Sequence, residues 1–148
     1  MGCNCTIYTS ATLVGNGDSG VLSLATIIND TRLAPLLNPN ALVIKSAWVR
    51  MVPENLATDE TLALDLNVSW DAAGAGDVKV HDFTGVTSSN VAETVILPGE
   101  ESEANLQFET GTAAGVLAAP IPPFWKFIWT LGGTTKSMNF TVYAALIF

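Results

Sequence analysis

Apolar and polar residues alternate along most of this chain, and hardly any stretch repeats with the period of a helix. The alternation is clearest in residues 61–71. Five apolar residues of this segment share one face: Leu62, Leu64, Leu66, Val68 and Trp70. Because successive side chains of a strand point to opposite faces, the segment predicts a half-buried strand with Trp70 in the core. Two glycines then allow a turn, and residues 78–83 are expected to form the hairpin partner.

The same alternation predicts strands elsewhere in the chain. They cover residues 6–14, 21–28, 41–52, 91–97, 104–110, 124–131 and 138–148. The first two flank the turn sequence GNGDSG and are expected to pair as a hairpin. Residues 111–123 are rich in Ala, Gly and Pro, so we expect a long loop there.

The apolar composition of two of these segments predicts where each strand lies in its sheet. Residues 41–52 are apolar on both faces, which predicts a central strand or one whose outer face meets a partner. Residues 138–148 stay apolar to the end of the chain and are expected in the middle of a sheet.

About eight strands without crossover helices predict an all-β fold, an antiparallel two-sheet sandwich. A jelly roll is the favoured arrangement, although the pattern also fits other sandwiches.

Composition narrows the class of protein and of partner. With 148 residues, 49% of them hydrophobic and 14% charged, the chain is expected to fold as a single domain, residues 1–148. The formal net charge of -8 disfavours nucleic acid and anionic membrane surfaces as partners. The C-terminal apolar run FTVYAALIF is about half as long as the roughly 20 residues of a spanning helix, so no membrane span is expected.

The N-terminus has no basic segment followed by an apolar one, so we expect synthesis in a cytoplasm and reduced cysteines. Cys3 and Cys5 are separated by one residue, a spacing that strains a disulfide and supplies too few ligands for structural zinc.

The sequence contains few residues that could act as catalytic groups. His81 is the only histidine, and Asp77 and Asp82 lie near it. Because neighbouring side chains of a strand point to opposite faces, His81 and Asp82 are not expected to share a ligand set, and His81 is expected to be a solvated residue at a strand end. Further carboxylates are expected to be a solvated acidic surface: Asp59, Glu60, Glu100, Glu101 and Glu103. We therefore predict no enzyme, no cofactor and no metal.

The chain has more large apolar residues than a single core is expected to bury. Trp48, Phe124 and Trp125 flank their strands or face outward from them, and they are interface candidates because aromatic residues dominate binding energy at interfaces. Packing in the sandwich core is the alternative.

Residues 1–6 are a candidate extended arm that reaches a neighbouring copy. Ile7 and Tyr8, next to this segment, are further interface candidates.

Two segments carry a resemblance to a known family: LDLNVSWDAAG, a strand that leads into a small-residue turn, and PPFWKFIWTLGGTT, a proline-led aromatic strand that runs into Gly-Gly-Thr. The layout resembles the small jelly-roll cement, or decoration, proteins of tailed-bacteriophage heads. The resemblance implies a virion protein on the capsid exterior that binds the major capsid protein, stabilises contacts between its subunits and self-associates as a dimer or trimer. It transfers no functional side chain.

A second hypothesis is a carbohydrate-binding β-sandwich module, for example at a virion tip or fibre. Sugars stack on exposed aromatic rings, and Trp48, which lies close to Arg50 in sequence, is the best candidate for such a platform.

Overall fold

The structure is a computed structural model that describes residues 2–28, 42–86, 92–97, 107–110, 113–116 and 120–148. These residues form eleven strands and one short helix. In chain order they are β1 (Gly2–Thr9), β2 (Gly17–Asp18), β3 (Leu22–Ser23), α1 (Leu24–Ile27), β4 (Ser46–Glu54), β5 (Thr61–Ser69), β6 (Val78–Val86), β7 (Glu93–Leu97), β8 (Gln107–Thr110), β9 (Ala113–Val116), β10 (Phe124–Gly132) and β11 (Asn139–Ile147).

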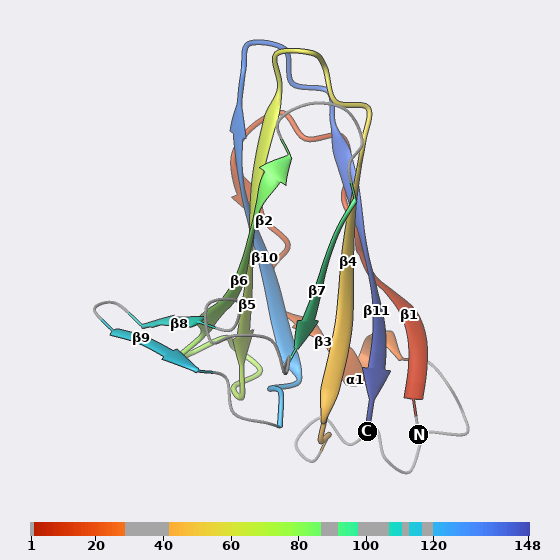
Figure 1. The fold of residues 1–148 in the computed structure, drawn as a ribbon, viewed down its shortest axis with the longest axis vertical. Coiled ribbons are helices and arrows are strands. Elements are labelled where there is room, and N and C mark those ends of the chain that lie inside the picture. The colour runs from red at the N-terminus through yellow and green to blue at the C-terminus, as the bar shows by residue number, and fades with distance from the viewer. Residues whose placement is uncertain (1, 29–41, 87–91, 98–106, 111–112, 117–119) are drawn as a thin grey trace.

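The strands form two antiparallel sheets that face each other (Figure 1). Sheet A has the order β1-β11-β4-β7. Sheet B has the order β2-β10-β5-β6-β8-β9, and β3 also pairs with β10. The predicted all-β, two-sheet antiparallel sandwich is confirmed.

The strand pairs give the sandwich the topology of a jelly roll. Strand β1 pairs with β11, β2 and β3 with β10, β4 with β7, and β5 with β6. With β2 and β3 counted as one interrupted strand, eight strands thus pair from the outside inward, as when a long hairpin is wrapped into two sheets. The β8–β9 hairpin is an addition to this frame.

The predicted alternation builds the core. The inward residues of β5 and β10 meet those of β4 and β11 in one cluster. The innermost include Leu64, Leu66, Val49, Met51, Phe127 and Phe140, each 0% exposed. Burial of such a side chain stabilises the fold by about 1.5–3 kcal/mol. Strand β11 lies between β1 and β4, in the middle of its sheet as expected.

The N-terminal part corrects three expectations. Residues 6–14 and 21–28 do not form a hairpin, because β1 pairs with β11 instead. The sequence GNGDSG lies along β10, where Asn16 Oδ1 accepts from the Leu131 N–H at 2.9 Å and Ser19 Oγ accepts from the Phe127 N–H at 2.9 Å. Residues 2–6 are part of β1 and do not extend away from the domain as an arm.

Two further differences concern the expected loop over residues 111–123 and the end of strand β5. The expected loop over residues 111–123 contains β9, which pairs with β8. Trp70 lies outside the core and is 59% exposed. Strand β5 ends at Ser69, whose hydroxyl donates to the Ala75 carbonyl and accepts from the Asp71 N–H, so the alternation stops before Trp70.

Candidate functional site

Four of the five predicted interface residues do not lie on an open surface. Ile7, Phe124 and Trp125 are only 4%, 5% and 0% exposed, and Trp125 Nε1 donates to the Pro122 carbonyl at 2.9 Å. The Tyr8 ring is partly buried and stacks 6.1 Å from the Phe127 ring. These four residues therefore pack within the monomer.

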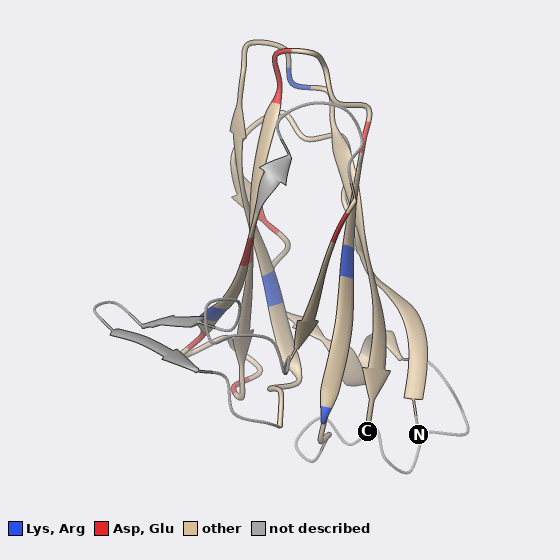
Figure 2. Ribbon diagram, viewed as in Figure 1, with Lys and Arg blue, Asp and Glu red and all other residues tan. Residues whose placement is uncertain are grey.

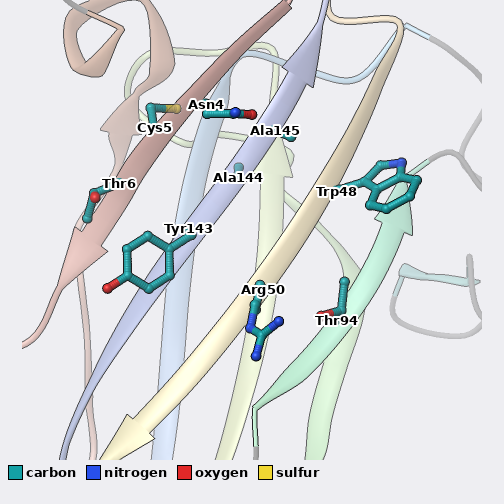
Figure 3. Close-up of a pocket in the computed structure, with 9 residues that line it drawn as sticks. All are labelled: Asn4, Cys5, Thr6, Trp48, Arg50, Thr94, Tyr143, Ala144 and Ala145. Atoms are coloured by element: carbon teal, nitrogen blue, oxygen red, sulfur yellow. The ribbon is translucent and has the colours of Figure 1, made fainter.

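Trp48, the fifth interface candidate, lies on an open surface. It is 56% exposed on the outer face of sheet A, as an outward residue of β4. Tyr143 of β11 is 44% exposed on the same face. Between them an open groove of about 530 Å³ crosses the sheet (Figure 3). Its lining residues come from all four strands: Asn4, Cys5, Thr6, Trp48, Arg50, Thr94, Tyr143, Ala144 and Ala145.

The strand register produces this arrangement. Two neighbouring rows of paired residues run across sheet A. One row is Asn4, Ala145, Trp48 and Ile96, and the other is Thr6, Tyr143, Arg50 and Thr94. Ala145 lies between Asn4 and Trp48 in the first row. Because its side chain is small, the surface of the sheet is depressed there. The second row places Arg50 between Tyr143 and Thr94 (Figure 3).

The charge of the groove is opposite to that of the protein. Its lining includes Arg50 and no Asp or Glu, whereas the chain has a formal net charge of -8. Arg50 is exposed and forms no ion pair with any residue in the described part of the chain. Burial, and secondarily the neighbouring Cys3, raises the pKa of the Cys5 thiol to about 12, so this residue brings no thiolate to the groove at neutral pH.

The outer face of sheet B is a charged network instead. Lys79 Nζ lies 3.7 Å from both Asp65 and Asp82, and Lys126 Nζ lies 3.4 Å from Asp77. Partial burial raises the pKa of Asp65; Asp82 adds to this effect and Lys79 opposes it. By contrast, β1 and β11 carry no charged residue (Figure 2). In sheet A, charged residues are therefore confined to β4 and β7, which carry Arg50, Glu54 and Glu93.

His81 is not the solvated strand-end residue that its sequence context suggested. It lies within β6, and its Nε2 is 3.1 Å from Glu93 Oε1 of β7, so this contact joins the two sheets. Its ring meets that of Phe83 edge-on at 4.4 Å. Asp82 instead pairs with Lys79, which agrees with the expected separation of Asp82 from His81. Within the described residues no group of three or more His, Cys, Asp or Glu side chains could hold a metal ion.

Glu60 is buried and anchors the fold, against the expected solvated surface, whereas Asp59 is exposed as expected and still bonds a neighbouring turn. Glu60 is 0% exposed; its Oε1 accepts from the N–H groups of Ser137 and Met138 at 2.8 and 3.2 Å, and its Oε2 accepts from Ala57 at 2.9 Å. Sequence reasoning missed this role because donor and acceptor lie nearly eighty residues apart. The other acidic candidates, Glu100, Glu101 and Glu103, lie outside the described residues.

Asp59 holds the turn between β10 and β11. Its carboxylate accepts from the Thr134 and Thr135 N–H groups and from the Thr134 hydroxyl, and these hydrogen bonds lower the Asp59 pKa to about 2. Gly133 has a φ of +98°, and a Cβ there would lie 2.3 Å from the Asp59 carbonyl oxygen, so the close approach requires glycine.

The chain matches none of the family models and none of the curated proteins with which it was compared. No helix in the described ranges is long and apolar enough to cross a membrane.

Proposed function

We propose that this chain is a non-enzymatic structural protein of a virion, a decoration protein that binds the outside of a phage head. In this role it contacts the major capsid protein, stabilises the contacts between capsid subunits and associates with further copies of itself. The resemblance of the sequence motifs to cement proteins supports the proposal, and so does the jelly-roll fold.

The observation that carries the self-association in this proposal is the edge of β1, which is unpaired among the described strands. Strand β1 ends the order of sheet A, and no described strand pairs with its other side. Its sequence, GCNCTIYT, contains no charged residue and no proline. Natural sheets usually protect an edge with such residues, because unpaired backbone groups otherwise add a strand from another chain. The one irregularity, between Thr6 and Tyr8, leaves residues 2–6 in regular pairing with β11.

The other edges fit this role less well. Strand β7 has five residues and includes Glu93, β2 and β3 have two residues each, and β9, the far edge of sheet B, is uncharged but has only four residues. Of these edges β1 therefore offers the longest uncharged one, and a strand of a second copy can extend sheet A there. An interface repeated around a lattice gains strength from many modest contacts.

The self-association is tested by the mass of the purified protein in solution, measured by light scattering. We compare the unmodified chain with Thr6→Lys, which adds a charge to β1, and with Thr130→Lys, which adds one to an exposed position of β10, a strand that is not at the edge of its sheet. We expect a dimer or trimer that Thr6→Lys dissociates and Thr130→Lys preserves. A monomer at every concentration, or an oligomer indifferent to Thr6→Lys, would contradict assembly through β1.

Attachment is tested with heads of the virus that encodes this chain, prepared without its gene. The purified protein is added to these heads, and bound copies and heat resistance are measured. We expect saturable binding and heads that release their DNA at a higher temperature than untreated heads. Failure to bind, with the protein also absent from intact virions, would overturn the proposed function.

A further inference from the structure

We infer that the groove on the outer face of sheet A binds a carbohydrate that carries a carboxylate, such as a uronate or a sialate. This goes beyond the proposed structural role and does not depend on it, because the side chains of the groove alone would hold the ligand.

Two aromatic rings provide the stacking surface. Trp48 and Tyr143 are 56% and 44% exposed, whereas the largest aromatic residues of the core, Trp125 and Phe127, are fully buried. The apolar C–H face of a sugar ring stacks on such aromatic faces, and the indole and phenol keep polar edges for hydrogen bonds. The two rings lie on adjacent strands: Tyr143 is opposite Arg50 on β11, and Trp48 is two residues before Arg50 on β4 (Figure 3).

Polar groups of the groove suit hydroxyl groups. Asn4, Thr6 and Thr94 line the groove with one amide and two hydroxyls, each able to donate and to accept. A few polar groups within a largely apolar site are typical of sites that orient a small ligand. The volume of about 530 Å³ lies within the range of roughly 300–1,000 Å³ found for ligand sites.

Arg50 defines the charge of the ligand. Its guanidinium has no ion-pair partner in the described part of the chain, and no carboxylate lines the groove. A guanidinium fork binds a carboxylate through two parallel hydrogen bonds. An acidic sugar can therefore form an ion pair with Arg50 that a neutral sugar cannot form. The net charge of -8 disfavours a long polyanion such as nucleic acid, which meets repulsion beyond the groove.

The test measures binding to the intact chain by calorimetry or by NMR titration. The probes are trigalacturonate and its methyl ester, which have the same backbone with and without charge, and sialyllactose with lactose as its neutral counterpart. The variants are Trp48→Ala, Arg50→Gln and, as a control, Lys126→Gln, which removes a cation from the opposite sheet.

We expect at least one acidic saccharide to bind at least about tenfold more tightly than its neutral counterpart. Arg50→Gln should remove that difference, Trp48→Ala should weaken both ligands, and Lys126→Gln should change neither. Three results would overturn the inference: no acidic saccharide binds at millimolar concentration, the neutral counterparts bind equally well, or Arg50→Gln has no effect. Binding of only an acetylated tripeptide through its C-terminal carboxylate would also overturn it. None of these results bears on assembly through β1, which the light-scattering experiment tests separately.

Discussion

Trp48 and Trp125 have the same side chain and opposite environments. The first is 56% exposed on β4, and the second is 0% exposed on β10 with its indole N–H bonded to the Pro122 carbonyl. A tryptophan in the core contributes to the free energy of unfolding, whereas an exposed one contributes little. The position of each ring in the sandwich therefore decides what it does.

We predict that Trp125→Ala lowers the free energy of unfolding by about 3–5 kcal/mol, because it leaves a cavity and an unbonded carbonyl. Trp48→Ala should change it by no more than about 0.5 kcal/mol. Urea unfolding followed by fluorescence measures both. Equal effects of the two substitutions would show that the burial difference is wrong.

The turn between β10 and β11 depends on two carboxylates from another part of the chain. Asp59 binds Thr134 and Thr135, and Glu60 binds the N–H groups of Ser137 and Met138 just before β11. Without these acceptors, several N–H groups near this turn would lose their partners. The segment before β5 thus fixes the path of the chain from β10 to β11.

The pH dependence follows from Asp59. Its folded pKa of about 2 lies below the ordinary value of about 3.9, so the native state binds fewer protons. The stabilisation by Asp59 is therefore complete above about pH 4 and is lost as the pH falls toward 2. We expect Asp59→Asn to be less stable at neutral pH and to lose less stability on acidification. Urea midpoints between pH 2 and 7 measure this, and parallel curves for both proteins would rule out the assigned role.

A jelly roll pairs the first strand with the last, so the whole molecule depends on its N-terminus. Strand β1 pairs with β11 from Gly2–Ile147 to Thr9–Thr141. Ile7 is buried, and the Tyr8 ring lies 5.7 Å from Phe140 and 6.2 Å from Trp129. The N-terminal segment is therefore part of the frame as well as the proposed site of assembly.

Deletion of residues 1–9 should lower the free energy of unfolding by at least about 3 kcal/mol, because it removes the burial of Ile7 and Tyr8 and uncovers β11. Thermal and urea unfolding of the truncated chain test this. Unchanged stability would indicate that β1 is dispensable for the fold. For this reason assembly is better tested with Thr6→Lys than with a truncation.

Part of the groove is visible in the sequence. Trp48 and Arg50 are two residues apart on one strand, so alternation alone puts them on the same face. Tyr143, Asn4 and Thr94 join them only through the pairing of β1, β11, β4 and β7. Those pairings connect residues up to about 140 positions apart, which no local pattern reports.

The sequence by itself determined the fold class and the apolar face of β5, β10 and β11, because the two-residue period of a strand is a local property. It also indicated the turn after β5 and two free cysteines, and both cysteines are free. The tertiary structure alone decided which strands pair, that Trp125 is buried while Trp70 is exposed, and that Glu60 bonds the backbone before β11. The physical reason is that burial and hydrogen-bond partners depend on strand order and register, which arise from contacts between distant parts of the chain.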